Sequence, residues 1–232
     1  MTKGNHLSIP KFRSDCLLSK GIEVRDLVRV RKETVMYVQP CVSERGKLMA
    51  DIELTKEPFG QFIDPETLCS LLDVHRRRFA ELKCSQSLGV AKLKLKGREI
   101  SIFKNGKLKI QRALDRDEIL RTANSLSRLI WGAAICEVCG QPTINCASGK
   151  CGKCALDEKV AVQTDALPNA ELLHQVCADL EKARKYPDES ENSLRAARYL
   201  ALFFTAEATS KEDAAIGLVL LAEAGLEKTP KD

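Results

Sequence analysis

Polar and apolar residues alternate strictly in two short stretches near the middle of the chain. Val90–Lys96 has the sequence Val-Ala-Lys-Leu-Lys-Leu-Lys, and Lys107–Ile110 has the sequence Lys-Leu-Lys-Ile. A period of two is typical of strands with one buried face, so both stretches are predicted to be strands with a lysine face. Between them, Glu99–Phe103 leads into Asn105-Gly106, which supplies the positive φ angles of a tight two-residue turn. A β-hairpin is predicted here.

Two more stretches, Val24–Val38 and Lys47–Leu54, are rich in β-branched and apolar residues and are separated by turn formers. They predict a hairpin or meander. Asp64 is a predicted cap for a helix that starts at Pro65 and runs towards Leu82.

Asp115 is predicted to cap a second helix. Its apolar residues recur every three or four positions, at Ile119, Leu120, Ala123, Leu126, Leu129 and Ile130. Residues 21–133 are therefore predicted to form an α+β domain of antiparallel strands with two helices, and the order of the elements is compatible with two similar halves.

The two ends of the chain differ in pattern. Residues 1–20 are polar and mixed, which predicts a loosely ordered start. Residues 165–228 are predicted to be a C-terminal helical bundle with a structural role, made of three amphipathic helices, Asn169–Tyr186, Ser193–Ala208 and Ser210–Leu226. Asn169 and Ser210 are the predicted caps, and Pro187 and Gly225 the predicted stops.

Composition and charge add two expectations. The chain has 232 residues, of which 44% are hydrophobic, and a net charge of +5. Between Arg76 and Arg112 there are twelve Lys or Arg and two Glu, whereas fifteen acids and nine bases follow Cys154. This asymmetry suggests two units with different surroundings. With no apolar run of roughly 18 residues and no signal-peptide pattern, we expect a cytoplasmic protein with no membrane contact.

Five of the ten cysteines lie within nineteen residues, at Cys136, Cys139, Cys146, Cys151 and Cys154. Without a secretory signal this clustering indicates metal ligation in a reducing compartment, and we predict a cysteine-rich metal-binding module at residues 134–160. The others, Cys16, Cys41, Cys69, Cys84 and Cys177, are scattered among apolar residues and are predicted to pack as small hydrophobic side chains.

Zn²⁺ is the favoured metal. Each C-x-x-C pair lets a tight turn direct two sulfurs at one ion, and Gly140 and Gly152 suit such turns. A closed tetrahedral site is predicted from Cys136, Cys139, Cys151 and Cys154, with Cys146 left over. A 4Fe-4S cluster is the alternative, because it also takes four thiolates and tolerates uneven spacing.

Cys136-x-x-Cys139-Gly140 followed by Cys146 resembles a bacterial ferredoxin motif, C-x-x-C-G-x-C-x-x-x-C-P-x-G, with Pro142 in place of the third cysteine and Ala147 in place of the proline. The longer segment from Val90 to Cys154 is similar to a segment of archaeal iron–sulfur proteins, including those related to phosphoadenosine phosphosulfate (PAPS) reductase. The resemblance implies an accessory module beside a nucleotide-binding catalytic domain. This chain has no phosphate-binding glycine loop of its own.

The predicted lysine face could bind phosphates of RNA or DNA through Lys92, Lys94, Lys96, Lys107 and Lys109. Lysine on strand faces also serves solubility and discourages edge pairing. Aromatic residues for base stacking are scarce near it.

Three functions are thus predicted. The favoured one is a non-enzymatic accessory protein with a structural zinc site, which presents a surface to a protein partner such as a sulfur-metabolism enzyme. The second is an iron–sulfur protein that passes electrons to a PAPS-reductase-like enzyme. The third is a zinc-ribbon factor that binds nucleic acid.

Overall fold

The structure is a computed structural model that describes residues 6–20, 30, 32–38, 47–54 and 61–226. The chain forms two compact units. Unit 1 comprises Met1–Lys20 and Cys136–Asp232, and unit 2 comprises Gly21–Ile135. The predicted mixture of antiparallel strands, helices and a C-terminal helical region is confirmed.

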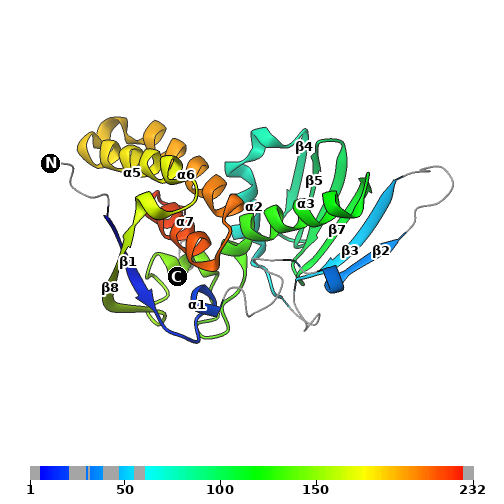
Figure 1. Ribbon diagram of the computed structural model, residues 1–232, viewed down its shortest axis with the longest axis horizontal. Helices are drawn as coiled ribbons and strands as arrows, with labels where there is room; N and C mark the ends of the chain where they lie inside the picture. The colour runs from blue at the N-terminus through cyan, green and yellow to red at the C-terminus, as the bar shows by residue number, and fades with distance from the viewer. Residues whose placement is uncertain (1–5, 21–29, 31, 39–46, 55–60, 227–232) are drawn as a thin grey trace. The chain divides into compact units, whose positions relative to one another are not determined.

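Unit 2 contains a six-stranded antiparallel sheet with the strand order β2-β3-β7-β6-β5-β4 (Figure 1). Its strands are β2 (Val35–Val38), β3 (Leu48–Glu53), β4 (Glu81–Ser85), β5 (Val90–Leu95), β6 (Arg98–Phe103) and β7 (Lys107–Ala113). The predicted alternation is confirmed, since Ala91 and Leu93 are buried while Lys92 and Lys94 are exposed. One face of the sheet is therefore core and the other is charged.

The apolar face of this sheet is covered by α2 (Pro65–Val74), which contacts β4 and β5, and by α3 (Arg116–Leu129), which contacts β3 and β7 (Figure 1). Both predicted caps are confirmed. Asp64 accepts a hydrogen bond from the Thr67 backbone N–H at 2.9 Å, and Asp115 accepts one from the Glu118 N–H at 2.6 Å. These bonds satisfy N–H groups that have no partner within the helix.

Helix α2 is shorter than predicted. It ends at Val74 instead of continuing towards Leu82, and a 3₁₀ turn at Arg76–Arg78 precedes β4. The residues that follow pair with β5, because Leu82 and Cys84 face the core and lie opposite Leu93 and Ala91. The prediction that Cys69 and Cys84 pack as free cysteines is also wrong, since a disulfide joins them and ties α2 to β4.

The two turns of the β5–β6–β7 meander differ from the prediction. The two-residue turn with positive φ at both positions is formed by Lys96 (φ 48°) and Gly97 (φ 79°), between Leu95 and its partner Arg98. Asn105 lies in a three-residue turn, Lys104–Gly106, in which Gly106 has a φ of 84°. Three-residue hairpin loops commonly place one residue in this left-handed region.

The strand predicted at Val24–Val38 is observed at Val35–Val38, where β2 begins after a 3₁₀ turn at Lys32–Thr34. The rest of that prediction lies largely outside the described residues, as does Cys41. The suggested duplication into two similar halves stays a prediction.

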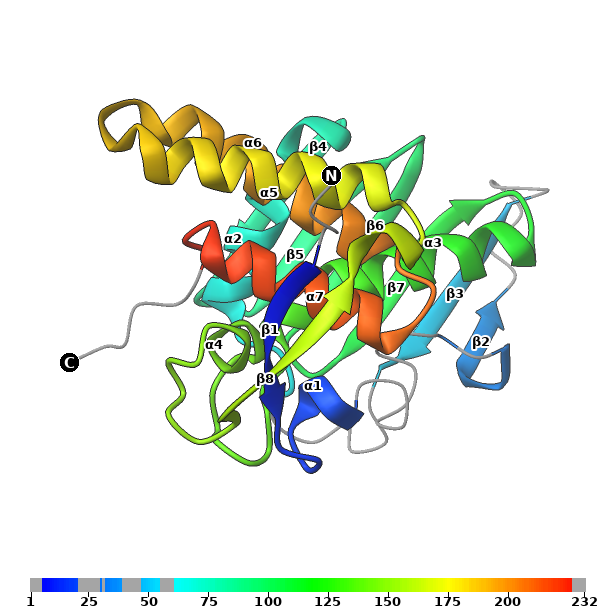
Figure 2. The same ribbon diagram turned by 60° about the vertical axis from the view of Figure 1, so that its left-hand side comes forward.

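Unit 1 combines a two-stranded sheet with helices (Figure 2). Its elements are β1 (His6–Phe12), α1 (Leu17–Lys20), α4 (Thr143–Ala147), β8 (Ala155–Gln163), α5 (Ala170–Lys185), α6 (Ser190–Glu207) and α7 (Lys211–Glu223). The expected loose start is wrong for residues 6–20, because β1 pairs with β8 and α1 contacts α4 and α7. Two segments far apart in the sequence thus share one unit.

The helices of unit 1 pack around α7, which is buried from Asp213 to Ala222 and contacts α4, α5 and α6. Ser210 caps α7 as predicted, by accepting from the Asp213 N–H at 3.1 Å. Asn169 precedes α5 as predicted but has a φ of 60° and makes no capping hydrogen bond with its side chain. Among the described residues, no helix is both long and apolar enough to cross a membrane.

Candidate metal centre

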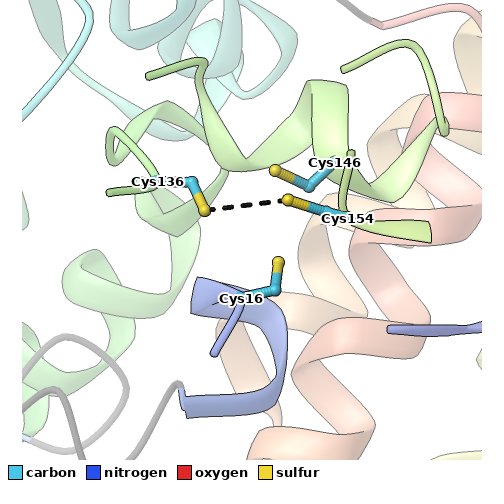
Figure 3. Close-up of side chains that lie close together, drawn as sticks. All are labelled: Cys16, Cys136, Cys146 and Cys154. Carbon is cyan, nitrogen blue, oxygen red and sulfur yellow. Dashed lines mark hydrogen bonds between the residues drawn. The ribbon is translucent and has the colours of Figure 1, made fainter. Parts of the chain in front are cut away.

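Six cysteine sulfurs converge in unit 1 as two overlapping groups of four. The first group is Cys16, Cys136, Cys146 and Cys154, all buried, and the second is Cys139, Cys146, Cys151 and Cys154. Within each group every pair of sulfurs lies within 4.8 Å. Figure 3 shows the four side chains of the first group pointing towards one another. The cluster could hold a metal ion.

The first C-x-x-C pair is shaped by a tight turn. The Gly140 N–H donates to the Cys136 carbonyl at 2.8 Å, and Gly140 adopts a φ of 70°, which favours glycine. The Val138 N–H hydrogen-bonds the Cys136 sulfur, and the Gln141 N–H hydrogen-bonds the Cys139 sulfur. Amides pointing at sulfur stabilise thiolate ligands.

The second C-x-x-C pair, Cys151 and Cys154, also contains a tight turn, in which Gly152 adopts a φ of 64°. The N–H groups of Lys153 and Cys154 hydrogen-bond the Cys151 sulfur. The Cys151 N–H donates to the Asn145 carbonyl at 3.1 Å, which anchors this turn to α4. Helix α4 carries Cys146, so the cysteine that the sequence leaves over belongs to both groups. The predicted set of Cys136, Cys139, Cys151 and Cys154 forms neither group.

Cys16 was not predicted to be part of the cluster. It is buried, as predicted for a cysteine that packs as a small hydrophobic side chain, but its sulfur also lies within 4.8 Å of those of Cys136, Cys146 and Cys154. Strand β1 ends at Phe12 opposite Ala155, the first residue of β8, so the chain after β1 meets the chain before β8. The Arg13 N–H then donates to the Cys154 carbonyl at 3.0 Å. The Leu17 N–H hydrogen-bonds the Cys136 sulfur.

The electrostatics of the cluster also favour a cation. Hydrogen bonds from the thiols of Cys146 and Cys16 lower the pKa of Cys136 far below its usual range. The hydrogen bond to Cys136 raises the pKa of Cys146, and burial raises the pKa of Cys139 and Cys154. Burial and like charge thus oppose thiolates at these three positions. At Cys151 the effect of burial is outweighed by hydrogen bonds from the Lys153 and Cys154 N–H groups, which lower the pKa. A divalent cation among the sulfurs is the group that would stabilise them, and thiolates suit zinc, copper(I) and iron–sulfur clusters.

The lysines predicted to bind phosphate belong to unit 2, whereas the cysteine cluster belongs to unit 1. Lys96 is in a turn rather than on the strand face, because β5 ends at Leu95. Three of the others form ion pairs with carboxylates on neighbouring strands: Lys94 with Glu81 (2.9 Å), Lys107 with Glu53 (3.6 Å) and Lys109 with Asp51 (3.9 Å). Interleaved carboxylates reduce the positive potential that phosphate binding needs. Nucleic-acid binding stays a prediction that this face does not favour.

Unit 1 also contains a cavity of about 300 Å³ lined by His6, His174 and Cys177, among others. His174 Nε2 lies 2.9 Å from an Asp165 carboxylate oxygen and 3.2 Å from the Thr164 hydroxyl. Burial raises the pKa of the Cys177 thiol, which keeps it protonated at neutral pH. A protonated thiol is a poor nucleophile, so this cavity does not resemble the site of an activated cysteine.

Searches against models of known protein families, curated proteins and solved structures find no match to this chain. The similarity to iron–sulfur proteins related to PAPS reductase therefore stays a prediction from its motifs.

Proposed function

We propose that this chain is a zinc protein whose cysteine centre has a structural role, and that it acts as a non-enzymatic accessory to a protein partner. The observation that carries the proposal is the convergence of buried sulfurs from Cys16, Cys136, Cys146 and Cys154 within 4.8 Å of one another. Three features support it: the distances between the sulfurs, the complete tetrahedral shell that four thiolates would form, and the distant chain segments that they would join.

The spacing supports ions bound directly by several thiolates. With Zn–S bonds of about 2.3 Å, two sulfurs of a regular tetrahedron lie about 3.8 Å apart. The Cys136 and Cys154 sulfurs are 4.0 Å apart, and those of Cys139 and Cys146 are 3.5 Å apart. In a 4Fe-4S cluster each thiolate binds a different iron, which spreads the cysteine sulfurs more widely. Zinc is therefore the better fit.

The closure of the site supports a structural role. Four thiolates complete a tetrahedral zinc shell and leave no position for a substrate. Zinc held this way would join Cys16 to a loop 120 residues later in the sequence, so binding energy would become folding energy for unit 1. Such a unit would act through its surface, which is the basis for proposing a protein partner.

The test is metal analysis with visible spectroscopy on protein purified without oxygen. We expect colourless protein that contains zinc, and ligand-field bands of tetrahedral thiolate coordination after replacement of zinc by Co²⁺. Brown protein that contains iron and inorganic sulfide would overturn the proposal in favour of the electron-transfer alternative. Protein that binds neither metal would overturn both.

A further inference from the structure

The overlap of the two sulfur groups raises the question of how many ions the centre holds. Cys146 and Cys154 belong to both groups, whereas each of the other four cysteines belongs to one. Two tetrahedra that share an edge have this arrangement: two shared corners and two further corners on either side. Six sulfurs can then complete the shells of two ions.

The sulfur–sulfur distances agree with this division into two groups. Cys136, which is in the first group only, lies 4.0 Å from the shared Cys154. Cys139, which is in the second group only, lies 3.5 Å from the shared Cys146. Both values are close to the edge of about 3.8 Å expected around one zinc ion. The shared Cys154 sulfur thus lies at ligand spacing from a sulfur found only in the first group. The shared Cys146 sulfur lies at ligand spacing from a sulfur found only in the second group.

A single ion would leave two prepared ligands unused. An ion in the first group leaves Cys139 and Cys151, whose sulfurs accept backbone N–H hydrogen bonds from Gln141 and from Lys153 and Cys154. An ion in the second group leaves Cys16 and Cys136, which are both buried. Amides directed at sulfur are the outer-shell support of a thiolate ligand, and they occur on both sides of the cluster.

The net charge of the centre also favours a second ion. One Zn²⁺ with four thiolates carries a net charge of −2, and two Zn²⁺ with six thiolates carry −2 as well. The second ion therefore brings two further thiolates into the site at no additional net charge, and the thiol protons are released to solvent. Six thiolates around a single ion would carry −4, which burial strongly disfavours.

We propose that the centre binds two zinc ions, with Cys146 and Cys154 as bridging ligands, Cys16 and Cys136 completing the first ion and Cys139 and Cys151 completing the second. This inference rests on the proposed zinc function. It adds Cys139 and Cys151 to the ligand set and assigns bridging roles to Cys146 and Cys154.

The first measurement is the zinc content of the reduced full chain, by elemental analysis against quantitative amino-acid analysis. Two zinc ions per chain are expected. One zinc ion per chain would overturn the two-ion centre and leave the proposed zinc function standing. Iron, or no metal, would overturn the proposed function itself.

The second measurement is NMR of the protein loaded with ¹¹³Cd²⁺, which reports directly on bridging. Two cadmium signals split by coupling to each other through the shared sulfurs are expected. Two unsplit signals would contradict the bridges, and a single signal would contradict the second ion. This experiment uses the unaltered chain, so it decides the question even if the cysteine variants do not fold.

Variants assign the ligands. Cys16→Ser and Cys139→Ser each remove a terminal ligand of one ion, so each is expected to halve the zinc content retained against a competing chelator. Cys146→Ser removes a bridge and should release both ions. Cys177→Ser, a half-buried cysteine of unit 1 outside the cluster, is the matched control and should retain two. Two retained ions in Cys16→Ser would remove Cys16 from the centre.

Discussion

At the scale of single residues, Glu81 shows how the charged face of the sheet is organised. Its carboxylate is 2.8 Å from the Lys83 ammonium and 2.9 Å from that of Lys94. Hydrogen bonds from these two lysines, first Lys83 and then Lys94, lower the pKa of Glu81 from 4.5 to about 2. The face therefore neutralises much of its own lysine charge.

This geometry predicts the pH range in which the Glu81 ion pairs act. Because the folded-state pKa is depressed, their contribution to stability is present above pH 4.5 and is lost as the pH falls towards 2. Carbon-detected NMR titration should find the Glu81 carboxyl midpoint near 2. Lys94→Ala should move it upwards, whereas Lys107→Ala, which removes the partner of Glu53, should not. An unchanged midpoint in Lys94→Ala would contradict the assignment.

At the scale of elements, the Asp115 cap of α3 gives the second prediction. Removing a capping side chain costs about 1 kcal/mol, so Asp115→Ala should lower the free energy of unfolding of unit 2 by about that amount. Trp131, the only tryptophan, is fully buried in the same unit and reports urea unfolding by fluorescence.

Asp115→Asn is the matched control. It keeps an accepting oxygen and removes the charge, and Asn and Asp are about equally good caps. Its stability should stay near that of the unaltered chain. A loss as large as that of Asp115→Ala would show that charge at the helix end, and not the hydrogen bond, is responsible.

The link between α2 and β4 gives the third prediction. A disulfide that closes a loop of about 15 residues stabilises by about 3 kcal/mol through the unfolded chain. We expect Cys69→Ser with Cys84→Ser to lower the stability of unit 2 by that order. Without reductant, alkylation followed by peptide mass analysis should leave both cysteines unlabelled. Labelling of both in the native chain would contradict the bond.

Local patterns were enough to predict the elements that local physics determines. Alternation identified β5 because one face is buried and the other is solvated, and Asp64 and Asp115 marked helix starts because their side chains satisfy nearby N–H groups. The end of α2 was not predictable in this way. It depends on the pairing of β4 with β5, which competes with continued helix.

The same distinction applies to the candidate metal centre. Five cysteines were found because they are close together in the sequence, and their C-x-x-C spacing encodes tight turns. Cys16 was not found, because it joins them only through the pairing of β1 with β8. Which cysteines are shared also depends on three-dimensional placement, since Cys146 is positioned by α4 rather than by a C-x-x-C turn.

At the scale of the whole molecule, every cysteine of the centre belongs to unit 1. Structural zinc contributes about 10–16 kcal/mol to folding in small zinc-finger peptides, and a whole domain is typically stable by about 5–15 kcal/mol. Removal of the proposed zinc should therefore unfold unit 1 rather than loosen it. Unit 2 has its own sheet and core, and its stability should not depend directly on the ion.

Circular dichroism and Trp131 fluorescence, recorded on one sample, distinguish the response of unit 1 from that of unit 2. The two longest helices, α5 and α6, belong to unit 1, so circular dichroism should lose most of its helical signal when a chelator is added to the reduced protein. Trp131 reports unit 2, and its emission should stay that of a buried indole. Addition of zinc should restore the helical signal, and magnesium should not, because thiolates bind it poorly. If Trp131 became exposed together with the loss of helix, the two units would have to unfold as one.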